Sequence, residues 1–137
     1  MSSATVIEAP LAGAPPGTPV AVYACLASPT FRDAALRGVE DFVRRHGWAS
    51  VETFIDIAEF ASSAEERPER AMALALVTRG EAKGVVAPSY SMLWHGPEER
   101  AEITDWQVRT GAWLSSPWNT TEITSRLGAS RPGRTAS

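Results

Sequence analysis

Two segments of the chain contain side chains that could do chemistry. Tyr23–Ser28 holds a cysteine and a serine, and Ser89–His95 holds two more serines and a histidine. A serine or cysteine acts as a nucleophile when a base such as histidine lies beside it and other groups stabilise the developing charge. Neither segment carries a complete set of nucleophile, base and charge-stabilising group. The residue types alone therefore predict no particular reaction.

Cys25 and His95 are the candidates for a thiol-based site. Cys25 lies inside the apolar run Val20–Leu26, which favours a buried side chain that behaves as a small hydrophobe. The alternative is a reactive thiol assisted by His95, which would make the protein a small thiol- or ligand-binding enzyme. His95 also fits a surface loop between Trp94 and Gly96. Because no further ligand accompanies it at a usable spacing, we expect no metal site and no cofactor.

Ser28 precedes Pro29, and this pair is typical of the start of a helix. Serine is a favoured N-cap residue, and proline is favoured at the first helical position. We therefore expect the Ser28 hydroxyl to cap a helix rather than to act as a nucleophile.

Short apolar runs alternate with helical patterns along the chain. The runs predict strands at 20–26, 51–57, 84–87 and 112–114, and the patterns predict helices that begin near Pro29, Pro68 and Pro97. This alternation predicts a three-layer α/β/α fold with a mainly parallel sheet of four to five strands. In such a sheet, functional residues gather beyond the carboxyl ends of the strands. The segments Tyr23–Ser28 and Ser89–His95 lie at such strand ends.

Residues 19–115 resemble the catalytic domain of the serine recombinases, the resolvase/invertase family. The resemblance rests on the segments AVYACLAS, FVRRHGWASVETFIDIAE and RPERAMALALVTRGEAKGVVAPSYSMLW. It implies a resolvase-like fold in which a serine attacks a DNA phosphodiester while arginines stabilise the transferred phosphoryl group.

Most of the polar residues that this resemblance implies are replaced. Five positions differ: Cys25 stands for an arginine, Ala27 for the serine nucleophile, Ser91 for an aspartate, and Met92 and His95 for two further arginines. Arg67 alone matches an active-site arginine, and Asp56 matches a family acid. Arg67 would bind an anion or pair with a neighbouring acid, of which the sequence offers Glu65, Glu66 and Glu69.

These losses predict a catalytically inactive recombinase-like domain that acts as a binding or regulatory module, with a protein as its partner. One alternative is a DNA-associated site-specific recombinase homologue with weak or partner-dependent activity. The others are the thiol enzyme described above and a degenerate fragment without a function. The formal net charge of −3 disfavours a polyanion, so we expect DNA binding to be weak. The oligomeric state is not predicted.

Tryptophans are concentrated in the C-terminal third of the chain. Trp106 and Trp113 fit core positions, whereas Trp94 and Trp118 fall in predicted loops and are candidates for an exposed contact surface.

The two ends of the chain are rich in proline, glycine and small residues. We expect residues 1–17 and 116–137 to be disordered around a domain at 18–115, and the C-terminal tail to be locally basic through Arg126, Arg131 and Arg134. The dimerisation helix and DNA-binding module that the resemblance implies are expected to be missing. A single cysteine, no long apolar stretch and no secretion signal favour a cytoplasmic, bacterial-type protein without a membrane partner.

Overall fold

The computed structural model of the chain describes residues 14–59 and 62–117. Its strands form one parallel sheet in the order β2-β1-β3-β4, with bounds β1 Pro19–Leu26, β2 Ala49–Ile57, β3 Gly84–Val86 and β4 Trp113–Ser115. The helices that connect them are α2 Arg32–Arg45, α3 Pro68–Thr78 and α4 Pro97–Thr110. The predicted α/β fold with a parallel sheet is confirmed.

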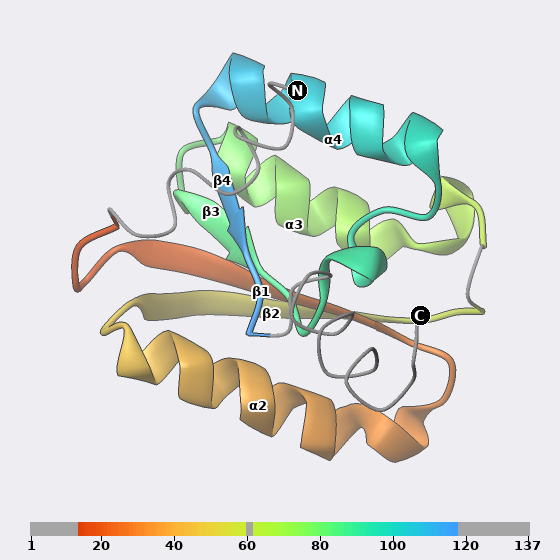
Figure 1. Cartoon of the computed structure of the whole chain (residues 1–137), viewed down its shortest axis with the longest axis horizontal. Coiled ribbons are helices and arrows are strands. Elements are labelled where there is room, and N and C mark those ends of the chain that lie inside the picture. The colour runs from red at the N-terminus through yellow and green to blue at the C-terminus, as the bar shows by residue number, and fades with distance from the viewer. Residues whose placement is uncertain (1–13, 60–61, 118–137) are drawn as a thin grey trace, which may run out of the picture.

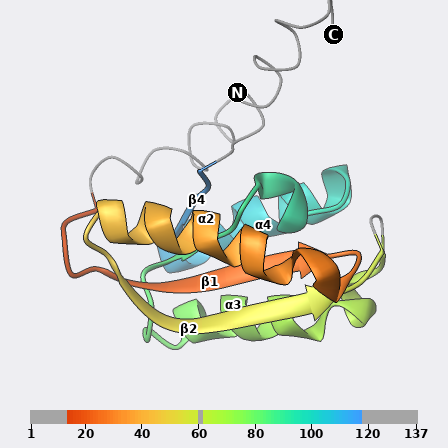
Figure 2. The same cartoon turned by 90° about the horizontal axis from the view of Figure 1, so that it is seen from below.

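The sheet is covered on both faces, and the central strand β1 shows why. Its residues are almost all apolar and buried, and they alternate between two cores. Val20 and Val22 pack in one core with Val39 and Val43 of α2, while Tyr23 packs in the other core, to which α3 and α4 contribute. The result is three layers, with α2 on one face and α3 and α4 on the other (Figures 1 and 2).

The helix boundaries follow the local sequence. Proline occupies the first turn of both α3 and α4, where its missing N–H costs nothing. Ser28 accepts a hydrogen bond from the Thr30 backbone N–H at 3.2 Å and so caps the short 3₁₀ helix that leads into α2, as the sequence predicts. Gly111 ends α4 with a φ of 73°, a left-handed conformation that glycine adopts without strain.

Two features of the core depart from the apolar pattern of the sequence. The helical spacing predicts an inward Phe31, but this residue precedes α2 and is 62% exposed. In β2 the buried side chains are Phe54 and Asp56, whereas Val51 and Ile57 are about half exposed. The reason is that β2 is an edge strand, so the face that packs under α3 is set by its register with β1 and not by the more apolar alternation.

The terminal segments are described only in part. Residues 14–17 lie against the domain, where the Gly17 N–H donates to the Gly47 carbonyl at 2.7 Å and the Ala14 carbonyl accepts from the Trp48 indole at 3.2 Å. Ser116 is buried and donates to the Pro88 carbonyl at 2.8 Å. The three tail arginines and Trp118 lie outside the described residues. None of the helices in the described ranges is long and apolar enough to cross a bilayer.

Candidate functional site

A small cavity lies at the carboxyl ends of β1 and β3, where a parallel α/β sheet places its functional residues. Its volume is about 180 Å³. The lining residues come from the end of β1 and from the loops after β1, β2 and β3: Cys25, Ala27, Ala58, Ser91, Met92 and His95. All five replaced positions of the sequence analysis therefore meet around one space, although they are as many as 70 residues apart in the chain. The groups that they bring there are a thiol, a methyl, a hydroxyl, a thioether and an imidazole.

Arg67 does not line this cavity. Its side chain is fully buried at the start of α3 and forms an ion pair with Glu99 in the first turn of α4. Its Nη2 also donates to the Ser62 carbonyl at 3.2 Å. The sequence offered three neighbouring acids as partners, and that expectation is wrong: the acid that the fold brings to Arg67 is 32 residues away.

The Arg67 guanidinium is not fully hydrogen-bonded. Nε and Nη1 are buried and have no partner among the described residues. Burial alone would raise the pKa of Glu99, but the His95 backbone N–H, which donates to it at 2.8 Å, and Arg67 outweigh burial and lower that pKa. Glu99 is therefore ionised at neutral pH and compensates the Arg67 charge.

Asp56 forms hydrogen bonds with residues that could not be identified as its partners from the sequence. Its two oxygens accept from the backbone N–H groups of Glu69 and Arg70, both at 3.0 Å, and from the Tyr23 hydroxyl at 2.8 Å. These amides belong to the first turn of α3, whose N–H groups lack partners within the helix. Asp56 thus caps α3 from the end of β2, and this role accounts for its buried carboxylate.

Cys25 is partly buried beside the cavity, and its environment disfavours the thiolate. Burial raises the pKa of the Cys25 thiol, and the charges of Asp56 and Glu99 add to the effect. The Tyr23 hydroxyl and the Arg67 guanidinium act in the opposite direction without cancelling it. A thiol with a raised pKa is a poor nucleophile at neutral pH. In the part of the chain that the structure describes, no group of three His, Cys, Asp or Glu side chains could hold a metal ion.

His95 lines the cavity, and Trp94 precedes it in the chain and packs against the core. The His95 ring Nδ1 is 3.4 Å from the Ser62 carbonyl, the same carbonyl that Arg67 contacts. The Trp94 ring stacks on Tyr90 at 5.5 Å, and the Arg100 guanidinium lies 5.5 Å from its centroid. Trp94 is therefore half-buried rather than a freely projecting loop residue.

Sequence reasoning missed three residues that build this region: Tyr23, Arg70 and Glu99. Buried Arg70 donates through Nε to the Leu93 carbonyl at 2.7 Å and so ties α3 to the loop that carries Ser91, Met92 and His95. A charged residue two positions after a proline that begins a helix looks like a solvated side chain in the sequence. The only signal that could have marked Arg70 is the apolar helix around it, since a helix packed on many sides buries some of its charges.

The fold was compared with known proteins. No family model matches the chain, and no curated protein sequence matches it. Among the solved structures that resemble it, three are each 17% identical in sequence. The C-terminal catalytic domain of ISC1926 TnpA, an IS607-like serine recombinase, aligns with a TM-score of 0.64 over 81% of this chain and 78% of that one.

The N-terminal catalytic domain of TP901-1 integrase aligns with a TM-score of 0.62 over 72% of this chain and 76% of that one. A serine recombinase from Sulfolobus solfataricus aligns with a TM-score of 0.56 over 80% and 77%. Identities this low establish the arrangement of elements and not the chemistry. The described part of this chain has the fold of a serine recombinase catalytic domain.

Proposed function

We propose that this protein is a recombinase-like domain that does not cleave DNA and serves as a binding or regulatory module. The observation that carries the proposal is the composition of the cavity at the carboxyl ends of the strands. Positions that the family resemblance assigns to a nucleophile, an aspartate and three arginines converge there, and they provide neither a serine at the nucleophile position nor any guanidinium.

Strand cleavage needs both a nucleophile and positive charge at the phosphoryl group. Ala27 has no hydroxyl, and the charge of Arg67 is compensated by Glu99. Removing a single charge-stabilising donor from an active site costs about 10²–10³ in rate. Several such losses together bring the rate of strand cleavage close to that of the uncatalysed reaction. Ser28 does not replace the nucleophile, because its hydroxyl is engaged with Thr30 as a helix cap.

The surface around the cavity supports a protein as the partner. Phe31 lies shortly after β1, and Ile57 is the last residue of β2, so both are at this edge of the sheet. Both side chains expose apolar area. Trp94, next to His95 in the chain, pairs an aromatic ring with the Arg100 cation, and both residue types are frequent in protein interfaces. The net charge of −3 supports the same choice, since DNA is a polyanion.

Affinity capture from the native host with mass spectrometry tests the binding role. We expect proteins retained by the wild type to be lost with Phe31→Ser. Val108→Ser is the matched control, because Val108 is 68% exposed near the other end of the domain, on α4, and should leave retention unchanged. Retention that is equal for all three proteins would contradict a partner surface at this edge.

The likeness to recombinase structures favours DNA as the alternative partner. In that case we expect salt-dependent retention on DNA that is lost when residues 123–137, with their three arginines, are removed. The thiol enzyme is less favoured, because burial raises the pKa of Cys25.

A further inference from the structure

The small cavity at the carboxyl ends of the strands brings together three side chains that bind soft metal ions. Cys25, Met92 and His95 all line this space of about 180 Å³. Thiolate and thioether sulfurs are ligands of soft ions such as Cu(I), and imidazole also binds copper. The expectation of no metal site rested on ligand spacing along the chain, where Cys25 and His95 are 70 residues apart, and only the fold brings them to one cavity.

The two sulfur-bearing side chains lie on the same face of the sheet. Cys25 is near the end of β1, and Met92 ends the 3₁₀ helix Tyr90–Met92 that follows β3. Both pack against the core that α3 and α4 share with the sheet, and both are partly buried. Cys25 is held in place by the sheet, and the loop with Met92 is held by Arg70, whose Nε donates to the Leu93 carbonyl at 2.7 Å. The two sulfurs therefore belong to segments that are fixed without a ligand.

His95 is oriented by contacts at both its backbone and its ring. Its backbone N–H donates to the Glu99 carboxylate at 2.8 Å. Its ring Nδ1 lies 3.4 Å from the Ser62 carbonyl, which can only accept, so the ring hydrogen is assigned to Nδ1 and the lone pair to Nε2. A ligating histidine typically donates its other ring N–H to a carbonyl in this way, which fixes the ring and makes the metal-binding nitrogen more basic.

The charges around the cavity favour a monovalent ion. Arg67 and Glu99 compensate each other, and in the described part of the chain no acid, lysine or arginine lines the cavity itself. Cu(I) bound to the Cys25 thiolate has no net charge, whereas a divalent ion would leave a positive charge uncompensated, which is costly in a partly buried space. Zn²⁺ is usually bound by three or four thiolate, imidazole and carboxylate groups, of which this lining offers only Cys25 and His95.

The Cys25 thiolate forms when a metal ion displaces the thiol proton. Burial raises the pKa of the Cys25 thiol, so the group is protonated without a metal, and the charge of Arg67 acts in the opposite direction. Arg67 also has two buried N–H groups, at Nε and Nη1, that have no partner among the described residues. Its positive charge therefore supports the negative charge of a metal-bound sulfur.

We infer that this cavity binds one Cu(I) ion through the Cys25 sulfur, the Met92 sulfur and the His95 Nε2. Binding breaks the S–H bond of Cys25, forms the bond between copper and sulfur and releases the proton to water, without a change of oxidation state. The inference does not rest on the proposed function, because metal binding is measured on the purified protein in the absence of DNA and of any partner.

The probe for the test is Cu(I), supplied without oxygen as its coloured bicinchoninate complex, whose absorbance falls as the protein takes the metal. We expect the full-length protein to take one Cu(I) per chain. Loss of an outer-shell partner of a metal site costs about 10–100-fold in affinity, so loss of a ligand should cost at least about tenfold. We therefore expect this loss in both Met92→Leu, which keeps the side-chain volume, and His95→Gln.

The chain offers matched controls for both ligands. Met72→Leu and His46→Gln remove the same chemical groups from exposed positions on α3 and directly after α2, and both variants should bind Cu(I) as the wild type does. Equal affinities for Met92→Leu, His95→Gln and the two controls would overturn the inference, because the metal would then be bound by the Cys25 sulfur alone.

A second measurement reads the thioether directly in the wild type. Methionine methyl groups labelled with ¹³C give separate resonances for Met72 and Met92, and Cu(I) is diamagnetic, so the resonances stay sharp. One equivalent of Cu(I) should shift the Met92 resonance and leave that of Met72 in place, whereas one equivalent of Zn²⁺ should move neither. A Met92 resonance that does not move at full Cu(I) occupancy would contradict the site, whether or not the variants fold.

Discussion

At the scale of single residues, the charges near the small cavity at the carboxyl ends of the strands serve the fold. Arg67 is paired with Glu99, Arg70 holds the loop that follows β3, and Asp56 caps α3. A buried charge costs several kcal/mol unless it is paired or hydrogen-bonded, so each of these groups has been brought to a partner. Groups committed in this way cannot approach a phosphodiester without breaking structural contacts.

Replacing Asp56 should destabilise the protein strongly. Asp56→Ala removes the acceptor of three hydrogen bonds and leaves the buried Tyr23 hydroxyl and two helix amides unsatisfied. We expect a loss of about 2–4 kcal/mol in the free energy of unfolding, measured by urea denaturation. Tyr23→Phe removes one of the three bonds and is the graded control, with a loss of about 1 kcal/mol. Equal losses for the two variants would show that Asp56 does not cap α3.

Glu99 makes stability depend on pH in a defined direction. Its pKa in the folded protein is lowered from the ordinary value of 4.5. The ionised carboxylate therefore stabilises the fold above pH 4.5, and this contribution is lost as the pH falls through the lowered pKa. Glu99→Gln should cost about 1–3 kcal/mol at pH 7, and the difference from wild type should shrink below pH 4.5. A difference that does not change between pH 7 and pH 3 would contradict an ionised Glu99.

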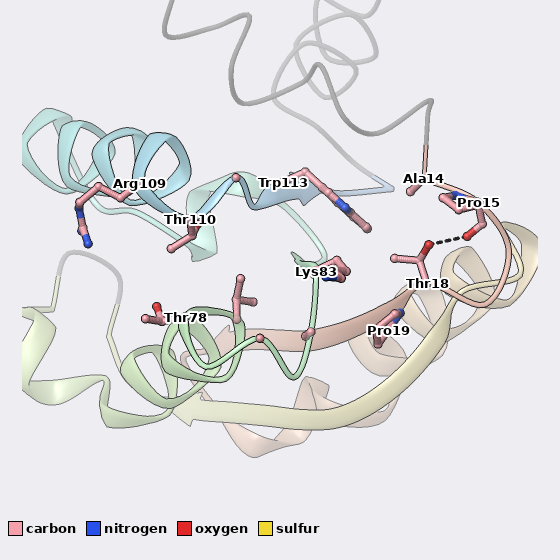
Figure 3. Close-up of a pocket in the computed structure, with 13 residues that line it drawn as sticks. Ala14, Pro15, Thr18, Pro19, Thr78, Lys83, Arg109, Thr110 and Trp113 are labelled. Carbon is pink, nitrogen blue, oxygen red and sulfur yellow. Dashed lines mark hydrogen bonds between the residues drawn. The ribbon is translucent and has the colours of Figure 1, made fainter.

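At the scale of elements, β3 and β4 approach each other closely where they begin. The Trp113 ring and carbonyl lie so close to Gly84 that a Cβ there would be 2.5 Å from the ring and 2.6 Å from the oxygen. Both strands have only three residues, so their pairing depends on this approach. Trp113 also lines a cavity of about 800 Å³ at the amino ends of the strands (Figure 3).

Gly84→Ala should therefore be much more damaging than an ordinary glycine substitution. The backbone oxygen of a strand cannot move aside, so we expect a loss of about 3 kcal/mol or more and a loosened β4. Gly80→Ala is the control, because Gly80 has a φ of +83° and open space around it and should cost only about 1 kcal/mol of backbone strain. Thermal unfolding compares the two. Similar losses would mean that the contact with Trp113 is not limiting.

Much of this arrangement could be predicted from the sequence. Proline at the helix starts, Gly111 at the end of α4 and the apolar run of β1 mark the elements and their order, because they act through local backbone preferences. The face that β2 buries could not be predicted, since it depends on register with β1 rather than on its own alternation. The ion pair of Arg67 with Glu99 was missed for a related reason: only the tertiary fold brings α3 and α4 together.

At the scale of the whole molecule, the two edges of the sheet have different characters. The carboxyl edge carries the small cavity with the replaced residues and an apolar rim, and the amino edge carries a cavity of about 800 Å³ that Lys83 and Trp113 line. The replaced residues could be assigned to one site from the sequence because the resemblance fixed their positions along the strands. The amino-edge cavity could not be predicted, because Lys83 and Trp113 carry no motif and meet only where β3 and β4 begin.

We propose that the carboxyl edge of the sheet does not cleave DNA, and the most direct test of this proposal is a search for a covalent intermediate. Supercoiled DNA is incubated with the wild type and with Ser28→Ala, and DNA linked to protein is detected after denaturation in detergent. An active serine recombinase serves as the positive control. We expect no linked DNA and no nicking above background with either protein. A linkage that forms with the wild type and disappears in Ser28→Ala would contradict the account.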